Sequence, residues 1–312
     1  MTLVGRGATG AVYQITASIA VKRARTGEDE QTDHAHEQKI FRILENHSPI
    51  PYLIRCHYQR PQDTFLEFAA NGCMATLLNR SQERDGVRVL GVSQLLDSQD
   101  VLRWMRQLCL AAAGLEEIGL AHGDIRPGNM LLDADWNLKL CDLDRAMDVG
   151  EDIMVLTEPF GRLLNQEEDG RGGGGEGGVA GTYGKAGART ETFAIGSVYY
   201  TLLRGHEPFE TEDWGKGHFV VLTEKFQKKD YPPLMDSAED VIIRKCWEGE
   251  YRRVRDLVAE FSGDEDAKED EQDGWIVEDH RQQLQQQQWL KAQRMDCIAY
   301  IENGSVDMLN RF

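Results

Sequence analysis

Apolar residues alternate with polar residues and glycines at the start of the chain. Residues 2–22 read TLVGRGATGAVYQITASIAVK, in which short β-type runs are separated by glycine or polar turns. This alternation predicts three strands joined by two turns. Residues 63–72, DTFLEFAANG, predict another strand that runs into a turn. The chain is therefore expected to begin with a strand-rich region.

The pattern changes to a helical spacing outside these strands. In residues 33–47 the apolar side chains recur at helical spacing, which predicts an amphipathic helix. Asp100 is expected to cap a long helix that ends at Gly119. Further helices are predicted at 192–205, at 240–261 (one or two) and at 281–302. A strand-rich beginning followed by a mostly helical body indicates an α+β protein.

The remaining segments predict turns and loops. Residues 80–97 have no clear period and predict a variable loop. Two apolar runs around 134–137 predict a hairpin. The glycine-rich stretch 167–187 predicts a mobile loop, and the acidic run 263–274 predicts a solvated linker.

Composition and charge exclude several classes of protein. The chain has 312 residues, of which 41% are hydrophobic and 28% charged, and its net charge is −18. A charge of this sign argues against a protein that binds nucleic-acid phosphates and against a polybasic membrane anchor. No apolar run approaches the ~20 residues that span a bilayer. We expect no nucleic-acid partner and no membrane insertion.

The cysteines and the first residues bear on the cellular compartment. The six cysteines are dispersed and include no CxxC pair, which is typical of reduced thiols and not of a disulfide framework or a zinc site. The opening MTLVGRG leaves no room for a signal or transit peptide. The expected location is cytoplasmic or nuclear, in soluble form.

A glycine pattern lies between the first two predicted strands. Gly5, Gly7 and Gly10 form GxGxxG, whose backbone N–H groups can approach phosphate oxygens. A dinucleotide-binding fingerprint needs a helix directly after the third glycine. Here AVYQI follows, which favours a strand. A glycine-rich hairpin over a phosphate group is therefore the better interpretation.

A lysine ends the third predicted strand. Lys22 closes the apolar run SIAVK beside the glycine hairpin, where its charge can reach phosphates. Such a lysine needs a carboxylate to hold it. Glu37 lies near the apolar stripe of the 33–47 helix and is the best candidate, while Asp33 and Glu45 are alternatives.

The stretch HGDIRPGN, residues 122–129, brings an acid, a cation and an amide into one short loop. In phosphoryl transfer the acid orients a hydroxyl, the amide holds Mg²⁺ and the cation faces phosphate. Asp124, Arg126 and Asn129 supply these groups. Asp142 ends a later buried strand and would complete a pair of oxygen ligands with Asn129.

These motifs, in this order, resemble the eukaryotic protein kinase family over residues 2–262. VGRGATGAV resembles the glycine-rich loop, IAVK the lysine strand, HGDIRPGNMLL the catalytic loop and CDLD the DFG motif. The resemblance implies a two-lobed α+β kinase-like fold with a small β-rich N-lobe and a mostly helical C-lobe. The implied boundaries are 1–66 for the N-lobe, 67–72 for the hinge, 73–262 for the C-lobe and 263–312 for the linker and helical tail.

The resemblance also assigns roles to individual residues. Asp124 would be the catalytic base, assisted by Lys22 and Arg126, while Asn129 and Asp142 would hold Mg²⁺. The residues implied to bind ATP are Val4, Gly5, Gly7, Gly10, Val12, Ala20, Lys22, Glu37, Glu67 and Ala69.

Four features depart from the family pattern. Gly123 replaces the arginine of HRD, and Leu143 and Asp144 replace the Phe and Gly of DFG. Glu191 stands where an aspartate is usual, and no APE motif precedes it.

The resemblance predicts a protein kinase that uses ATP and Mg²⁺ on a protein substrate. Arg126 and Pro127 favour serine or threonine as the phosphorylated residue. Two alternatives stay open: a small-molecule phosphotransferase of the aminoglycoside or choline type, whose loop also reads HGDxxxxN, and a non-catalytic kinase-fold scaffold. The tail is a candidate site for a further protein partner.

Overall fold

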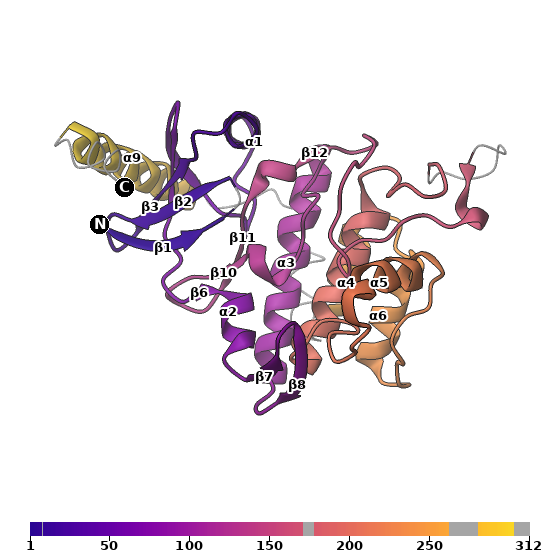
Figure 1. The fold of residues 1–312 in the computed structure, drawn as a ribbon. Coiled ribbons are helices and arrows are strands. Elements are labelled where there is room, and N and C mark those ends of the chain that lie inside the picture. Colours follow the sequence, from indigo (N-terminus) through magenta and orange to yellow (C-terminus); the bar gives the residue numbers. More distant parts are fainter. Residues whose placement is uncertain (8, 171–177, 262–279, 303–312) are drawn as a thin grey trace. The chain divides into compact units, whose positions relative to one another are not determined.

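The chain divides into two compact units. The structure, a computed structural model, describes residues 1–7, 9–170, 178–261 and 280–302 (Figure 1). The first unit comprises Met1–Asn46, Ile54–Ala70 and Ser262–Phe312, and the second comprises His47–Leu53 and Asn71–Phe261. The first is built on a β-sheet and the second is mostly helical, which confirms the predicted α+β class.

The sheet of the first unit is antiparallel, with the strand order β1-β2-β3-β5-β4. Its strands are β1 (Thr2–Arg6), β2 (Gly10–Gln14), β3 (Ile19–Ala24), β4 (Cys56–Arg60) and β5 (Asp63–Glu67). The three strands predicted in residues 2–22 and the strand after residue 63 are confirmed. β4 was not predicted, because CHYQR contains too few apolar residues to stand out.

Helix α1 (Glu28–Leu44) contacts β3 in the same unit. The helix was predicted, but its start at residue 33 was wrong. Three acidic residues, Glu28, Asp29 and Glu30, form the first turn, where their charges favour the helix N-terminus. Their side chains are polar, so the apolar period detects only the later turns, where Ile40 and Phe41 are buried.

The last helix, α9 (His280–Glu302), packs against the sheet of the first unit (Figure 1). Cys297 is fully buried in a cluster with Ile19, Val21 and Phe65. Ser18 Oγ donates to Gln293 Oε1 at 3.0 Å. The predicted helix is confirmed, and its packing makes it part of the sheet's hydrophobic core. The acidic run 263–274 lies outside the described residues.

The second unit contains most of the helices. They are α2 (Met74–Asn79), α3 (Ser98–Glu117), α4 (Ala188–Arg204), α5 (His218–Gln227), α6 (Ala238–Glu248) and α7 (Val254–Val258). Helix α4 packs against both α3 and α6 (Figure 1), and Trp247 on α6 is almost fully buried. The helices predicted near 192–205 and 240–261 are confirmed, the second as two helices separated at Gly249, whose φ is +74°.

The start of α3 corrects one prediction. Asp97, not Asp100, is the N-cap: its carboxylate accepts from the N–H groups of Gln99 and Asp100. Two acids three positions apart both suit a helix start, and only the backbone decides which one lies outside the helix. The predicted end at Gly119 is confirmed, with φ at +81°.

The loop predicted at 80–97 is wrong in part. Strands β7 (Gln82–Asp85) and β8 (Arg88–Val92) form a hairpin there. Strand β7 (QERD) is mostly charged and β8 (RVLGV) is interrupted by a glycine, so the sequence shows no regular apolar alternation. Contacts from distant segments hold the hairpin, such as Val89 N–H to Glu210 O at 3.0 Å and Arg84 to Glu210 at 2.5 Å.

The hairpin around 134–137 is confirmed. Strands β10 (Met130–Leu132) and β11 (Leu138–Leu140) pair antiparallel, and β6 (Gly72–Cys73) joins β10. A second small ribbon pairs β9 (Leu120–Ala121) with β12 (Met147–Asp148). These two ribbons flank the 122–129 loop in the chain and fix both of its ends.

The glycine-rich stretch 167–187 has defined ends. Leu164 accepts from Gly181 N–H and donates to Thr182 O, and Gly170 N–H donates to Gly178 O. Residues 171–177 between them lie outside the described residues. Among the helices that the structure describes, none is long and apolar enough to cross a membrane.

Candidate active site

The glycine hairpin lies at the turn between β1 and β2. Gly7 N–H donates to Gly10 O at 2.9 Å and closes the turn. A Cβ on Gly10 would lie 2.3 Å from the carbonyl oxygen of Arg23, so packing on β3 alone requires this glycine. Cβ atoms on Gly5 or Gly7 would meet nothing closer than 3.9 Å. Packing therefore does not explain these two glycines, whose missing side chains leave open space at the turn.

Lys22 and Glu37 form a buried ion pair in the first unit. The Lys22 Nζ atom lies 3.0 Å from Glu37 Oε1, and the two side chains are 9% and 1% exposed. A pair buried this deeply stays charged only when each charge has its partner. The predicted choice of Glu37 over Asp33 and Glu45 is confirmed as a contact.

Two of the residues implied to bind ATP, Ala20 and Glu67, lie on strands of this sheet. Ala20 on β3 and Leu66 on β5 are direct cross-strand partners, and both are buried. Glu67 ends β5, and its N–H donates to Arg55 O at 2.9 Å. Ala69 follows two residues later and is also buried.

The 122–129 loop in the second unit concentrates polar contacts on Asp124. The Asn129 Nδ2 atom donates to Asp124 O at 2.8 Å and to Asp124 Oδ2 at 2.7 Å. Arg126 Nε donates to both carboxylate oxygens, at 2.9 and 3.1 Å. Burial opposes the charge of Arg126, but the Asp124 carboxylate raises its pKa above the ordinary value. The three residues predicted to act together are therefore in direct contact.

His122 holds this loop through two hydrogen bonds of its ring. The Asp124 N–H donates to its Nδ1 at 3.2 Å, which leaves the ring proton on Nε2 to bond Cys141 O at 3.0 Å. Complete burial lowers the pKa of His122, so the ring is neutral and keeps this arrangement. The sequence pattern by itself predicted no role for His122.

Glu191 holds the same loop through its backbone. Its carboxylate accepts from His122 N–H at 2.8 Å and from Gly123 N–H at 3.2 Å. Burial raises the pKa of Glu191 to about 7, although the two N–H bonds oppose that rise. A glutamate thus reaches the loop from the position where the family usually has an aspartate.

Gly123 is required by the local backbone. Its φ is +75°, a region that favours glycine, and a Cβ would lie 2.5 Å from Arg145 O. An arginine at this position would need the backbone to move. The packing of the loop therefore requires glycine at this position, where HRD has arginine.

Asp142 follows a residue whose backbone is hydrogen-bonded to Asn129. The N–H of Cys141 donates to Asn129 O at 2.9 Å, directly before Asp142 in the chain. Asp142 adopts φ 68° and ψ 75°, a conformation that non-glycine residues rarely hold. Strained backbone of this kind concentrates at functional sites, where the surrounding structure fixes it.

These two residues fit Mg²⁺. They offer an amide oxygen and a carboxylate, the hard oxygen donors that Mg²⁺ prefers. Among the described residues, no group of three or more His, Cys, Asp or Glu side chains could hold a metal ion.

A carboxylate clamp in the second unit was not predicted. Arg162 is buried and binds both oxygens of Glu168, at 2.7 and 2.5 Å, and Lys229 Nζ lies 3.3 Å from the same carboxylate. Burial opposes the charge, but hydrogen bonds from Arg162 and the Asn165 N–H lower the pKa of Glu168 to about 2. An acid among several in NQEED gives no signal in the sequence, because the pattern does not show which of these carboxylates Arg162 and the distant Lys229 will bind.

Comparison with known proteins decides the family. The sequence model of the protein tyrosine and serine/threonine kinase family matches residues 1–157, half of the chain, and this range includes the glycine hairpin, Lys22, Glu37, the 122–129 loop and Asp142. The chain belongs to the protein kinase family. The predicted two-lobed kinase fold class is confirmed with it.

Individual relatives share the kinase region. The chain is 26% identical over 253 residues to rat citron rho-interacting kinase, covering 77% of this chain and 11% of that protein. It is 21% identical over 291 residues to human serine/threonine-protein kinase MRCK gamma, covering 84% and 17%. It is 28% identical over 175 residues to a tyrosine kinase receptor of Drosophila melanogaster, covering 52% and 23%. The chain thus spans less than a quarter of the length of each of these three relatives.

Proposed function

We propose that this chain is an ATP- and Mg²⁺-dependent protein kinase that phosphorylates serine or threonine hydroxyls of a protein substrate. The observation that carries the proposal is the contact of Asn129 and Arg126 with the Asp124 carboxylate, next to Asp142. A scaffold that only binds partners has no need for a partly exposed, hydrogen-bonded set of this composition.

The residues of the chain have distinct tasks in the proposed reaction. Asp124 accepts the hydrogen bond of the substrate hydroxyl and orients its oxygen for in-line attack on the γ-phosphorus. Arg126 binds Asp124 through its Nε, and its two Nη groups would bind the phosphate charge. Lys22, held by Glu37, orients the other phosphates.

Asn129 and Asp142 would hold Mg²⁺ through their side-chain oxygens. When bound, the ion neutralises phosphate charge. Asn129 donates through its Nδ2 to Asp124, so its Oδ1 would be the atom that binds the metal. The same hydrogen bonds fix Asp124, the proposed base, relative to Asn129.

The preference for serine and threonine rests on Arg126 and Pro127. Relatives with a serine/threonine-kinase name, such as human MRCK gamma, support the same choice. A transfer assay with γ-labelled ATP tests the proposal on a protein mixture and, in parallel, on small alcohols and aminoglycosides. Phosphoserine or phosphothreonine in protein is the expected product. Label only in small molecules, or only in tyrosine, would reject the proposal, and no magnesium-dependent turnover at all would favour a scaffold.

A further inference from the structure

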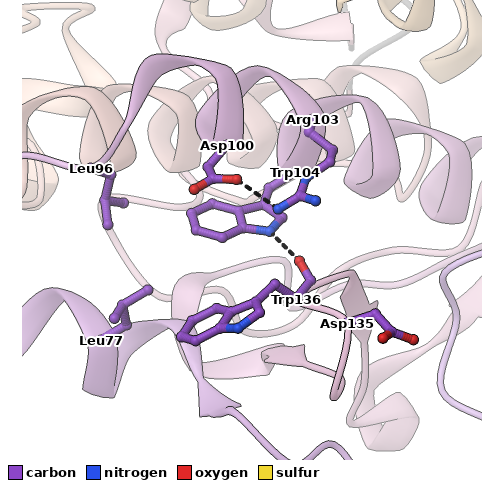
Figure 2. A pocket seen from close by; sticks show the side chains of 7 residues that line it. All are labelled: Leu77, Leu96, Asp100, Arg103, Trp104, Asp135 and Trp136. Atoms are coloured by element: carbon purple, nitrogen blue, oxygen red, sulfur yellow. Dashed lines mark hydrogen bonds and ion pairs between the residues drawn. The ribbon is translucent and has the colours of Figure 1, made fainter.

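The polar groups that line a pocket in the second unit mainly bind one another. The pocket has a volume of about 400 Å³, and Figure 2 shows Trp104 and Trp136 as two of its walls. Trp104 Nε1 donates to Trp136 O at 2.8 Å, and Arg103 pairs with Asp100 at 2.6 Å. In Figure 2 the Asp135 carboxylate points away from the Trp136 ring. These contacts hold the walls of the pocket together.

The first unit contains a buried histidine with a ring nitrogen that has no hydrogen-bond partner among the described residues. His34 lies on α1, three positions before Glu37, and is 1% exposed. The nitrogen without a partner is its Nδ1 atom. Its Nε2 atom lies 3.0 Å from the Nε2 atom of Gln38, which is one helical turn later. Two nitrogens at this distance form a hydrogen bond only when one donates and the other accepts.

The surroundings of Gln38 decide which nitrogen donates. Its side-chain nitrogen lies 2.7 Å from Arg60 O, 3.3 Å from Asp63 O and 3.3 Å from Thr64 Oγ1. Carbonyl oxygens only accept, so the amide turns its NH₂ group towards them and not its oxygen. An NH₂ group only donates. The Nε2 atom of His34 must therefore be the acceptor.

This hydrogen bond requires a neutral His34. A ring that accepts at Nε2 carries its single proton on Nδ1. A second proton would place an N–H of His34 against the NH₂ group of Gln38, donor against donor, and would add a cation near Lys22. Burial and then the charge of Lys22 lower the pKa of His34, against an opposing effect of Asp63. The packed helix thus keeps the ring neutral.

The charges that face the ring from the sheet are Lys22 on β3 and Asp63 on β5, and both are already paired. Lys22 Nζ lies 3.0 Å from Glu37 Oε1 on α1. The Asp63 carboxylate is bound by Arg23 at 2.7 Å and lies 3.5 Å from Arg60. Because Asp63 already binds two guanidinium groups, its charge does little to stabilise a protonated ring.

We propose that Gln38 and His34 are positioning residues that fix α1 on the sheet so that Glu37 holds Lys22, and that protonation of His34 releases the helix. Gln38 is the chain neighbour of Glu37, and its backbone oxygen also accepts from Gln59 Nε2 on β4 at 3.1 Å. A displacement of Gln38 therefore moves Glu37 with it. The inference rests on the proposed function, since Lys22 orients the phosphates in that reaction.

Nuclear magnetic resonance of the full chain labelled on histidine tests the protonation state. The ring ¹⁵N chemical shifts distinguish the two neutral forms from each other and from the protonated ring. We expect His34 to be neutral with its proton on Nδ1 at pH 7.5, and the variant His34→Gln identifies its signals by their loss. A proton on Nε2 would overturn the inference, because Gln38 could then not donate to that atom.

Amide hydrogen exchange of α1 measures release of the helix without any turnover. The ring regains its ordinary pKa of 6.5 when the helix is released, whereas the packed ring has a lower pKa. The packed state is therefore fully stable above pH 6.5 and loses stability as the pH falls below it. After correction for intrinsic exchange, the opening constant of the wild type should rise up to about tenfold from pH 7.5 to pH 5.5.

Two histidine variants make this measurement specific. Glutamine at position 34 is neutral at every pH and can place its oxygen where the ring has Nε2, so the opening constant of His34→Gln should not change with pH. The matched control is His36→Gln, a partly exposed histidine on another face of α1, which should respond as the wild type does. An opening constant that is independent of pH in the wild type, or equal pH responses of the wild type and His34→Gln, would overturn the inference.

The variant Gln38→Leu tests the link to the phosphates at pH 7.5. It should lower kcat/KM for ATP and the affinity for a fluorescent nucleotide about tenfold, the equivalent of one or two hydrogen bonds. Gln62→Leu, an exposed glutamine between β4 and β5, is its control and should change neither. Loss of stability without a change in kcat/KM or in nucleotide affinity would show a purely structural role and reject the positioning role.

The same measurements separate this inference from the proposed function. If Gln38→Leu does not fold, the test is the nucleotide affinity at pH 5.5, of which His34→Gln should keep a larger share than the wild type. A pH-dependent opening and nucleotide affinity, with no phosphoryl transfer to any substrate, would reject the kinase activity and keep the inference. Turnover and nucleotide affinity whose pH dependence is the same in the wild type and His34→Gln would do the reverse.

Discussion

The Glu191 carboxylate accepts a hydrogen bond from the backbone N–H of Gly123 at 3.2 Å, in a loop where Gly123 has no space for a side chain. The same carboxylate binds the N–H of His122, so one buried acid holds the two residues before Asp124. The 122–129 loop is thus held through its backbone N–H groups. The group that holds them is a side chain of the chain itself and not a group added after folding.

This arrangement predicts activity that does not depend on phosphorylation between Asp142 and Thr190. In kinases with HRD, the arginine grips a loop phosphate. Gly123 cannot do so, and the Thr190 hydroxyl is buried and donates to Gly187 O. Treating active enzyme with a broad phosphatase, with dephosphorylation checked by mass spectrometry, should leave the rate unchanged. A tenfold fall that rephosphorylation of one loop residue restores would show that another cation serves a phosphate.

Replacing Glu168 by glutamine should destabilise the second unit in a pH-dependent way. The folded pKa of about 2 lies below the ordinary 4.5, so the carboxylate contributes stability above pH 4.5 that is lost as the pH falls towards 2. The shift corresponds to about 3 kcal/mol at most. Urea unfolding of both proteins from pH 7 to pH 3 measures the difference. Glu167→Gln, an exposed neighbour, is the control, and a gap that stays constant with pH would contradict the ion-pair explanation.

Asp124→Asn should lower turnover by ~10²–10⁴ and leave ATP binding nearly intact, as expected when a general base is lost. The amide keeps the shape of the side chain, although it replaces an oxygen that accepts from Asn129 and Arg126. ADP release gives the rate, and titration with a fluorescent nucleotide gives the affinity. Asp236→Asn controls for loss of a carboxylate elsewhere, and wild-type turnover of Asp124→Asn would reject the catalytic assignment.

Lys22→Met should destabilise the first unit by about 3 kcal/mol, because Glu37 would keep a buried charge without its cation. The double variant Lys22→Met with Glu37→Leu should recover much of that stability, since it removes both charges. It should recover no turnover, because Lys22 is no longer there to orient the phosphates. Thermal unfolding followed by circular dichroism and the transfer assay measure the two quantities. Equal stability of the single and double variants would show that the pair is not coupled.

Cys297→Asp should lower the stability of the first unit, because it places a charge in the cluster of Ile19, Val21 and Phe65. The expected fall is several kcal/mol, enough to release the helix from the sheet. Met295→Asp is the matched control on the same helix, where the side chain is 59% exposed, and it should change little. Limited proteolysis after residue 279 reports the release. Equal effects of the two variants would contradict the packing of α9 on the sheet.

The sequence determined the features that depend on local pattern. Alternating apolar residues predicted the strands of the first unit, and helical spacing predicted α1, α3, α4 and α9, because burial of one face imposes these periods. The order of the glycine hairpin, Lys22, Asp124, Asn129 and Asp142 indicated phosphoryl transfer. These residues rarely occur together by chance in this order and at these spacings. The contact of Lys22 with Glu37 was predicted from the apolar stripe of one helix.

Tertiary structure decided what depends on residues far apart in the chain. Glu191 reaches the loop over almost seventy positions, and only the packed fold shows that its two oxygens match two adjacent N–H groups. Strands β7 and β8 show no regular apolar alternation, and in the fold Val89 N–H donates to Glu210 O and Gln82 Nε2 to Gly205 O, which attaches their hairpin to distant segments. Asp97 rather than Asp100 begins α3, since capping depends on one backbone angle. Hydrogen bonds and ion pairs between distant segments leave no period in a sequence, because their partners meet only after the core has formed.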